Sequence, residues 1–222
     1  MNLWTIIPVK SLQETKTRLS NVLSPEERAQ LTQTILSRTM MLLQMVTAVH
    51  QTVVVSRDPI VAEMAAAAHC QTVAEPAGSD LNSAVTLGAA FAADNGATHL
   101  LILPADLPFL RQDELQLLLS RVETASTSPT ENSRTRGQAV SSDTLFLCSD
   151  QQRKGTNALV LPAGSGFRFG YGRNSAQHHQ AEATRLGWAC QMLHLSSIAF
   201  DLDSEADYNR YTNEVAVQGT AL

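Results

Sequence analysis

The stretch His99-Leu100-Leu101-Ile102-Leu103-Pro104-Ala105-Asp106-Leu107-Pro108 decides the fold. Four of its first five residues are aliphatic, which is typical of a central strand that is buried on both faces of a parallel sheet. An aspartate follows at once, between two prolines that restrict the backbone of its loop. Because ligands of open α/β sheets bind beyond the carboxyl ends of the strands, this stretch predicts a central strand with a carboxylate at the ligand-binding edge.

Strands and helices are expected to alternate on both sides of this stretch. The clearest helix start is at residues 24–27, where Ser24 can cap the helix, Pro25 suits its first turn and Glu27 completes a capping box. Apolar periodicity and turn residues delimit the other elements. The expected strands are 3–8, 52–56, 71–75, 99–103, 144–148, 157–161, 190–195 and 198–202, and the expected helices are 24–45, 60–68, 82–94, one from about 111, 175–186 and one from 204. This alternation predicts βαβ units and a mostly parallel sheet.

Length and composition are those of one globular domain that spans residues 1–222. Hydrophobic residues make up 44% of the chain and charged residues 17%. The net charge of -5 argues against nucleic acid as a partner, because binding to a phosphate backbone needs clustered Lys and Arg. Residues 123–142 are rich in Ser and Thr and nearly lack large apolar groups, so they predict a mobile surface insertion in this domain.

The cysteines and the apolar segments bear on the cellular compartment. Cys70, Cys148 and Cys190 are odd in number and far apart, which argues against a disulfide framework and a metal knuckle and favours a reducing environment. The first strand is expected to begin without the charged flank and long apolar run of a signal peptide, and no segment has the length of a membrane span. We therefore expect a cytoplasmic protein with no membrane partner.

Two acidic segments are candidates for metal binding. Asp106 lies just past the central strand, and magnesium prefers oxygen ligands from one or two carboxylates together with phosphates. The alternative is that Asp106 caps the helix that begins near Arg111. Asp201 and Asp203 lie on an expected strand, where alternate residues share a face, so both carboxylates can point the same way. The alternative for this pair is that Asp203 or Ser204 caps the closing helix.

The basic residues of the loop after the first strand are candidates for binding a triphosphate. This loop, PVKSLQETKTRL at residues 8–19, contains Lys10, Lys16 and Arg18. It has no glycine, so side chains must supply the positive charge that phosphates need. The position of Lys10 at the strand end favours a functional role, whereas Lys16 and Arg18 can equally belong to a solvated loop.

Turn-rich segments near the C-terminal half suggest an anion site. Gly155-Thr156-Asn157 and Gly170-Tyr171-Gly172-Arg173-Asn174-Ser175 both precede predicted elements. Ser175 starts a helix, so its hydroxyl and the neighbouring amides can bind an anion at the positive end of the helix dipole, although ordinary turns share this composition. Asn82, at another helix start, can contact a base or ribose or cap its helix.

Taken in order, several segments resemble one known family. They are Ile7-Pro8-Val9-Lys10, Lys16-Thr17-Arg18-Leu19, Leu23-Ser24-Pro25-Glu26-Glu27-Arg28, Leu81-Asn82, Leu103-Pro104-Ala105-Asp106-Leu107-Pro108, Gly155-Thr156-Asn157-Ala158-Leu159, Phe169 to Ser175 with His179, and Asp201-Leu202-Asp203. The set, from Trp4 to about Tyr211, resembles the guanylyltransferases of coenzyme F-420 biosynthesis, which make 2-phospholactate- or enolpyruvyl-diphosphoguanosine. The resemblance implies a single Rossmann-like nucleotidyltransferase (GT-A-like) domain, with helices on both faces of a mostly parallel mixed sheet.

The resemblance also implies the substrates, GTP and a small phosphorylated acid, and residues that bind them. The acid would be held, partly through main-chain donors, by Thr156, Gly172 and Ser175. The residues implied for the nucleotide are Lys10, Lys16, Arg18 and Asn82. The identity of the acid is open between phosphoenolpyruvate, 2-phospho-L-lactate and 3-phosphoglycerate, and a homodimer is expected.

For metal and catalysis, the resemblance implies two magnesium ions. Asp106 would be one ligand and the pair Asp201 and Asp203 would supply the other, with the leading member of the pair left open. The implied catalytic residues are Asp106, Lys10 and Arg18. GMP transfer would follow from attack of the acid's phosphate on the α-phosphorus of GTP, with pyrophosphate as the leaving group.

Three departures from the family pattern bear on the acceptor more than on the reaction. Ser204-Glu205-Ala206-Asp207 replaces a more usual Thr-Pro-Glu-Asp, Cys148-Ser149-Asp150-Gln151 is an unusual start for the acceptor loop, and the insertion at 123–142 is longer than expected. Two other functions are open as alternatives. One is a cytidylyl- or sugar-nucleotide-forming transferase of the same fold, and the other is a nucleotide-binding module without catalysis.

Overall fold

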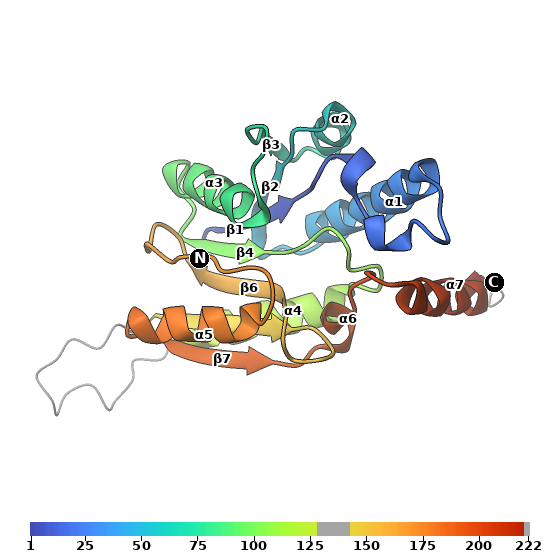
Figure 1. The fold of residues 1–222 in the computed structure, drawn as a ribbon. Coiled ribbons are helices and arrows are strands. Elements are labelled where there is room, and N and C mark those ends of the chain that lie inside the picture. The colour runs from blue at the N-terminus through green and yellow to red at the C-terminus, as the bar shows by residue number, and fades with distance from the viewer. Residues whose placement is uncertain (128–142, 220–222) are drawn as a thin grey trace, which may run out of the picture.

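The computed structural model describes residues 1–127 and 143–219 (Figure 1). The strands are β1 (Leu3–Pro8), β2 (Val49–Val55), β3 (Gln71–Val73), β4 (His99–Ile102), β5 (Thr144–Ser149), β6 (Thr156–Pro162) and β7 (Ala189–Leu193). The helices are α1 (Pro25–Gln44), α2 (Pro59–Ala67), α3 (Leu81–Asp94), α4 (Gln112–Thr127), α5 (Ser175–Arg185), α6 (Ser196–Ala199) and α7 (Glu205–Gly219). Two short 3-10 helices, η1 (Leu12–Glu14) and η2 (Thr17–Leu19), lie between β1 and α1.

The strands of the described chain form one seven-stranded sheet in the order β3-β2-β1-β4-β6-β5-β7. β4 is the middle strand, which confirms the central position predicted for residues 99–103. It pairs in parallel with β1 and antiparallel with β6, whereas β5 and β7 are parallel to each other. The amino end of β6 therefore lies at the same edge as the carboxyl ends of β1 and β4. This mixed, mostly parallel sheet confirms the predicted fold class.

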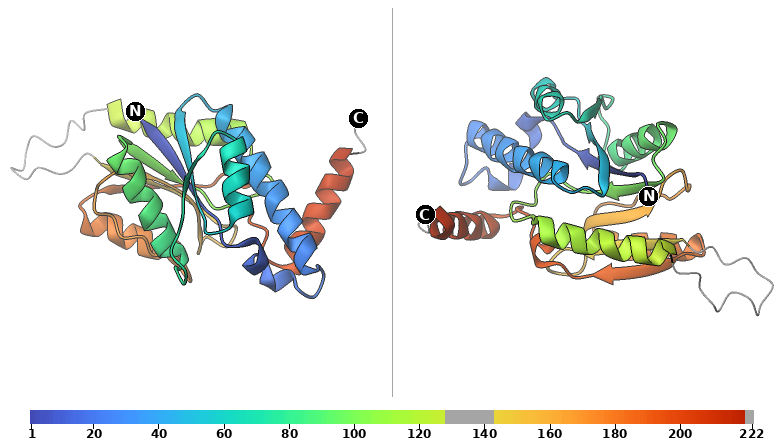
Figure 2. Two further views of the ribbon diagram at one scale, coloured as in Figure 1. Left: turned by 90° about the horizontal axis from the view of Figure 1, so that it is seen from above. Right: turned by 180° about the vertical axis from the view of Figure 1, so that it is seen from behind.

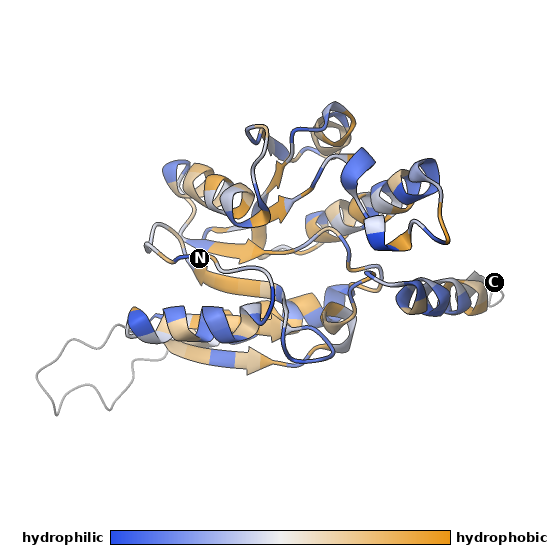
Figure 3. Ribbon diagram, viewed as in Figure 1, coloured by the Kyte–Doolittle hydropathy of each residue, from blue (hydrophilic) through white to orange (hydrophobic). Residues whose placement is uncertain are grey.

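Helices cover both faces of the sheet, because successive side chains of each strand point to opposite faces (Figure 2). Ile7 belongs to a core cluster with residues of α1, α2, α4 and α6, such as Leu43 and Leu115. The next residue back, Ile6, packs in a second cluster with α3 and α5, which contribute Val85 and Ala183. Figure 3 shows the result, with apolar strands between helices of mixed polarity. The inner strands β4, β5 and β6 are therefore buried on both sides, as expected for this class of sheet, whereas the edge strands β3 and β7 are largely exposed.

The start of α1 has the local structure that its sequence predicts. Ser24 accepts a hydrogen bond from the main-chain N–H of Glu27, and the Glu27 carboxylate accepts one from the main-chain N–H of Ser24. This capping box, with Pro25 in the first turn, satisfies main-chain donors that the helix leaves free. α1 thus begins where the sequence analysis placed it.

The strand predicted at 198–202 is wrong. Residues 196–199 form the short helix α6, and residues 200–203 belong to no strand of the sheet. The Glu114 carboxylate of α4 accepts hydrogen bonds from the main-chain N–H of Ser197 and from the Ser196 hydroxyl, at 2.8 Å each, so it caps α6 from a distant part of the chain. Burial still alternates, because Leu202 is buried while its two neighbours are partly exposed.

The predicted insertion lies mostly outside the described residues. Its first five residues, 123–127, are helical and continue α4, which corrects the predicted boundary, and residues 128–142 are not described. At the other end of the chain, α7 packs through Tyr208 and Tyr211 on a small cluster, and its C-terminal part extends away from the rest of the fold (Figures 1 and 2). No helix within the described ranges is both long and apolar enough to span a bilayer.

Candidate functional site

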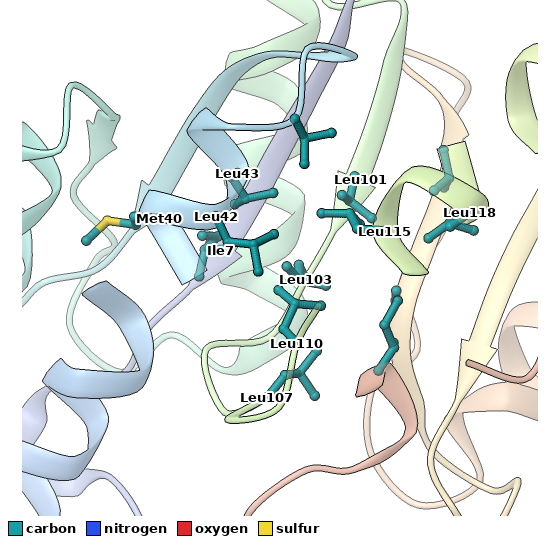
Figure 4. Packing of buried hydrophobic residues seen from close by; sticks show 14 of the residues in the cluster. Ile7, Met40, Leu42, Leu43, Leu101, Leu103, Leu107, Leu110, Leu115 and Leu118 are labelled. Atoms are coloured by element: carbon teal, nitrogen blue, oxygen red, sulfur yellow. The ribbon is translucent and has the colours of Figure 1, made fainter. Parts of the chain in front are cut away.

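The loop after β4 and the segment before α7 meet at the carboxyl edge of the sheet. The main-chain N–H of Leu202 donates a 3.0 Å hydrogen bond to the carbonyl of Asp106. Leu107 and Leu110 anchor the loop of Asp106, because both side chains are buried in the core cluster with residues of β4 and α4 (Figure 4). On its far side, the Arg38 guanidinium donates to a main-chain carbonyl of the same loop. Both acidic segments are therefore fixed by the backbone and the core.

The three carboxylates of these segments repel one another. Burial, reinforced by the charge of Asp106, raises the pKa of Asp201 from 3.8 to about 6. Burial and the same neighbour also raise the pKa of Asp203, and the charges of Lys16 and Arg18 partly offset this effect. Asp106 thus lies close enough to both carboxylates to raise their pKa values. The site is one of concentrated negative charge, which favours a cation.

The donor set of these carboxylates fits magnesium. The Asp106 Oδ1 atom is buried and has no hydrogen-bond partner among the described residues, so an unsatisfied ligand oxygen is available. In the described part of the chain, no three His, Cys, Asp or Glu side chains are grouped tightly enough to hold a metal ion by themselves. Magnesium suits this arrangement, because it is commonly held by one or two carboxylates, with waters and substrate phosphates as further ligands.

The predicted basic residues take up different environments. The backbone of Lys16 has the left-handed conformation, with φ at 52°. Its ammonium lies 3.4 Å from Asp106 Oδ2 and also donates a hydrogen bond to the Leu202 carbonyl. Its side chain is only 6% exposed, so it belongs to the acidic site. Arg18 is exposed and lies 3.2 Å from Asp203 Oδ2, and Lys10 is exposed just past β1. Of the three basic residues predicted in this loop, Arg18 and Lys10 are therefore the ones that solvent, and hence a phosphate chain, can reach.

Asp58 holds the loop that carries these cations, and the sequence analysis did not single it out. Its Oδ2 accepts hydrogen bonds from the Leu12 main-chain N–H and the Ser11 hydroxyl, and Oδ1 caps α2 through Ile60 N. Burial alone would raise the pKa of Asp58, but these hydrogen bonds lower it overall. The signal in the sequence was an aspartate directly before Pro59, after a buried strand.

A second polar group lies where β6 begins and α5 starts. Thr156 Oγ1 accepts a 3.2 Å hydrogen bond from the Ser175 hydroxyl and lies 3.0 Å from His179 Nδ1. These three side chains are buried. Gly172, at φ +131°, is exposed beside them, and its carbonyl accepts from Ser175 N. The structure thus brings together the three residues implied for the acceptor.

The amides at the start of α5 are less available than predicted. Ser175 N donates to the Gly172 carbonyl and Ala176 N donates to the Lys154 carbonyl, so neither is free for an anion. The Gly172 N–H makes no hydrogen bond within the described residues and remains a donor. The main-chain amides of Ser175 and Ala176 therefore cannot serve the anion site expected at this helix start, and the amide of Gly172 can.

Asn82 connects α3 to the loop before α5. Its side-chain carbonyl accepts a 2.7 Å hydrogen bond from Tyr171 N, and its amide donates at 3.1 Å to Tyr171 O. The alternative that Asn82 caps α3 is wrong, since Asp80 occupies the cap position and accepts from Ser83 N. A contact of Asn82 with the nucleotide stays a prediction.

The alternative helix caps are resolved in the same way. Arg111 holds the cap position of α4, where its carbonyl accepts from Leu115 N, so Asp106 is not a cap. Ser204 caps α7 through Asp207 N, and the Asp207 carboxylate accepts from Ser204 N. Asp203 pairs instead with Arg18. Asp106 and the pair before α7 are therefore left for the site rather than used by helix ends.

Comparison with known proteins shows the family to which the chain belongs. Residues 3–135 match the family described as "Guanylyl transferase CofC like". The chain belongs to this guanylyltransferase family. Among its relatives, a phosphoenolpyruvate guanylyltransferase of Rubrobacter xylanophilus is 34% identical over 98% of this chain and 97% of the relative. One from Sphaerobacter thermophilus is 31% identical over 96% and 93%, respectively.

Solved structures support the fold of this guanylyltransferase. A putative nucleotide-diphospho-sugar transferase from Desulfovibrio desulfuricans superposes with a TM-score of 0.68 at 16% identity, covering 94% of this chain and 86% of that one. A nucleotidyl transferase from Methanothermobacter gives a TM-score of 0.66 at 12% identity, covering 98% and 99%. At these identities the likeness shows the nucleotidyltransferase fold alone.

β6 links the two polar groups of this guanylyltransferase. The Asn157 amide donates to Asp201 Oδ1 at 3.3 Å and to the Ile198 carbonyl at 2.9 Å. Its neighbour Thr156 carries the other group, and adjacent strand residues point to opposite faces. Asn157, to which the sequence analysis gave no role in the site, therefore joins the acidic site to the strand that carries Thr156.

Proposed function

We propose that this guanylyltransferase moves GMP from GTP to phosphoenolpyruvate or 2-phospho-L-lactate, releases pyrophosphate and serves coenzyme F-420 biosynthesis. The observation that carries the proposal is the start of β6, where Asn157 is bonded to the acidic site and Thr156 to the group implied for the acceptor. Thr156 and Asn157 are consecutive residues at the amino end of β6, so both groups lie at the edge of the sheet where β1 and β4 end, which is where a metal-bound nucleotide and a small anion would have to meet. The names of the relatives from Sphaerobacter and Rubrobacter support GTP as donor and phosphoenolpyruvate as acceptor.

The proposed reaction is an in-line displacement at the α-phosphorus of GTP. A phosphate oxygen of the acid forms the new P–O bond as the bond to the β-phosphate oxygen breaks, and pyrophosphate leaves with that electron pair. The acid's phosphate is already ionised near neutral pH, so no general base is required. Catalysis then depends on positioning and charge neutralisation, which can together lower a barrier substantially.

The chain's own residues divide these tasks. Thr156, Ser175 and the free N–H of Gly172 would hold the phosphate of the acid. Arg18 and Lys10, which solvent reaches, would neutralise the triphosphate. We propose that Asp106 and Asp201, with Asp203 beside them, hold two magnesium ions. When bound, these ions supply charge neutralisation to the attacking and leaving oxygens.

The test measures pyrophosphate release in the presence of magnesium, with GTP, CTP or UTP as donor and each of the three acids as acceptor. We expect release to require GTP and an acceptor together, and mass spectrometry to find the acid joined to GMP through a diphosphate. A strong preference for CTP or UTP would overturn the guanylyl assignment. Binding of GTP with no product under any acceptor would restore the non-catalytic alternative.

A third acceptor, 3-phosphoglycerate, has its own support. A relative in Phenylobacterium zucineum, 29% identical over 91% of this chain and 86% of the relative, is named 3-phospho-D-glycerate guanylyltransferase. The competition assay should therefore present all three acids at equal concentration and compare their products. The acid with the largest kcat/KM is the substrate that the pocket selects.

A further inference from the structure

His179 lies at the centre of the group beside β6, although it is not among the residues implied for binding. Its side chain is fully buried, and both ring nitrogens have partners. Nε2 accepts a 3.0 Å hydrogen bond from the main-chain N–H of Gly170, and Nδ1 lies 3.0 Å from Thr156 Oγ1. One imidazole thus connects the loop that carries Gly172 with the first residue of β6.

The partner of Nε2 decides where the imidazole proton lies. A main-chain N–H can only donate, so Nε2 must be unprotonated to accept from Gly170. A neutral imidazole carries one proton, which places it on Nδ1. His179 therefore donates to Thr156 Oγ1. Burial, together with the neighbouring His178, lowers the pKa of His179 to about 4, which agrees with a neutral ring.

This proton position determines what Thr156 and Ser175 present to an incoming anion. The two hydroxyls have two hydrogens, and one of these serves the 3.2 Å bond between them. Because Thr156 accepts a hydrogen bond from His179, the hydroxyl hydrogen of Thr156 is not donated to the ring. That hydrogen can therefore point outward, towards an anion. With the opposite tautomer, Thr156 would donate to Nδ1, both hydrogens would be consumed, and only lone pairs would face the anion.

We propose that His179, held as the Nδ1–H tautomer by Gly170, is a positioning residue that turns the Thr156 and Ser175 hydroxyls into a hydrogen-bond donor for the phosphate of the acceptor. This inference rests on the proposed function, in that it takes the acceptor to bind at Thr156. It adds a residue and a proton direction that determine whether this site attracts or repels a phosphate.

Aromatic neighbours keep the ring in this orientation. Tyr171 lies edge-on to the imidazole with ring centres 4.8 Å apart, and Phe167 lies 5.8 Å away on another side. Tyr171 is itself fixed through its main chain by Asn82. A flipped ring would place a carbon against the Gly170 N–H and leave that donor without a partner, which is costly in a buried site.

Two variants test the two hydrogen bonds of the imidazole, one to Thr156 and one from Gly170, separately. In His179→Asn, the side-chain amide can place its N–H where Nδ1 was, so the donor to Thr156 is retained. In His179→Gln, the longer side chain reaches the position of Nε2, so the Gly170 partner is retained and the donor to Thr156 is lost. Steady-state kinetics are measured for both variants with GTP and the acceptor varied separately.

We expect His179→Gln to raise the KM for the acceptor roughly tenfold or more, the usual effect of losing a hydrogen bond to a charged group. Its KM for GTP and its kcat should change less than about threefold, since the lost contact acts on the bound acceptor. His179→Asn should have an acceptor KM within about threefold of the wild type. Equal losses in the two variants, or losses in kcat or in the KM for GTP, would show a merely structural role and overturn the proposal.

The proton position is measured independently of activity. Nitrogen-15 NMR of the histidine-labelled wild-type protein without substrates distinguishes protonated from unprotonated ring nitrogens. We expect His179 as the neutral Nδ1–H form, assigned by loss of its signals in His179→Gln or, if that variant does not fold, by through-space contacts to Tyr171. An Nε2–H ring or a charged ring overturns the inference even if GMP transfer is confirmed. An Nδ1–H ring in a protein that lacks GMP transfer means that the proposed function failed, and the acceptor role with it.

Discussion

Replacing Asp201 by asparagine should stabilise the protein at neutral pH while reducing its activity. The carboxylate of Asp201 is partly buried and interacts with the charge of Asp106, and these two causes, burial first, raise its pKa to about 6. Asparagine has nearly the same shape, and its side-chain carbonyl can still accept the hydrogen bond from Asn157. The substitution therefore removes a destabilising charge and little else.

The expected gain follows from the pKa. A folded-state pKa of about 6 against 3.8 means that, at pH values between these two, Asp201 in the folded protein holds a proton that the unfolded chain has released. Stability is thus greatest below pH 4 for this group and is lost as the pH rises through about 6. The full difference corresponds to about 3 kcal/mol at about 1.4 kcal/mol per pKa unit, and solvent screening of this partly exposed group reduces it to about 1–2 kcal/mol.

Urea unfolding measures the effect. In buffer with a chelator at pH 8, Asp201→Asn should exceed the wild type by about 1–2 kcal/mol in free energy of unfolding, and the gap should close towards pH 4. Magnesium with GTP should then stabilise the wild type more than the variant. Asp203→Asn is the comparison, with a smaller gain because Arg18 and Lys16 already offset that charge. Equal stability of wild type and Asp201→Asn at pH 8 would refute the repulsion argued from the structure.

Three further substitutions test other parts of the argument. Asp106→Asn should lower pyrophosphate release at least about 100-fold with an unchanged circular dichroism spectrum, and near-normal release would show that the metal assignment is wrong. Asp58→Ala should lower the free energy of unfolding by about 1–3 kcal/mol, because it removes a helix cap. It should also raise the KM for GTP, because Asp58 anchors the loop after β1. An unchanged KM would show that this loop does not bind the nucleotide. Gly88→Ala should lower the free energy of unfolding by about 1–3 kcal/mol, because the added Cβ would lie 2.6 Å from Ile6 Cγ2 and 2.7 Å from Val55 Cγ2. A melting temperature equal to that of the wild type would mean that α3 can move away from the sheet.

Local signals in the sequence predicted much of the fold correctly. The capping box at Ser24 depends on residues three positions apart, and the apolar run at 99–103 identifies a strand buried on both faces. Both signals are complete within a few residues of chain. The position of Asp106 at the ligand-binding edge then follows from the topology of α/β sheets, without knowledge of any contact.

The errors arose where distant residues decide the local structure. The segment 198–202 has the alternation of a strand, but Glu114 caps a helical turn there from 83 residues away along the chain. Asn82 has the composition of a cap, and its amide is instead bonded to Tyr171, 89 residues later. The proton on His179 depends on one N–H of Gly170. Such partners are set by the packed fold, and no periodicity in the sequence reports them.

The way in which the acidic segments are joined explains how three like charges stay together. Leu202 is buried in a small cluster with Leu19 and Leu23, so the acidic segment before α7 packs directly on η2. Its N–H bonds to the Asp106 carbonyl, and its carbonyl accepts from Lys16, whose ammonium also faces the Asp106 carboxylate. Apolar burial and main-chain hydrogen bonds thus hold the two acidic segments together, although their carboxylates repel one another. If a divalent cation binds Asp106 as we propose, it must share that carboxylate with Lys16, and the charge of Lys16 would then weaken its binding.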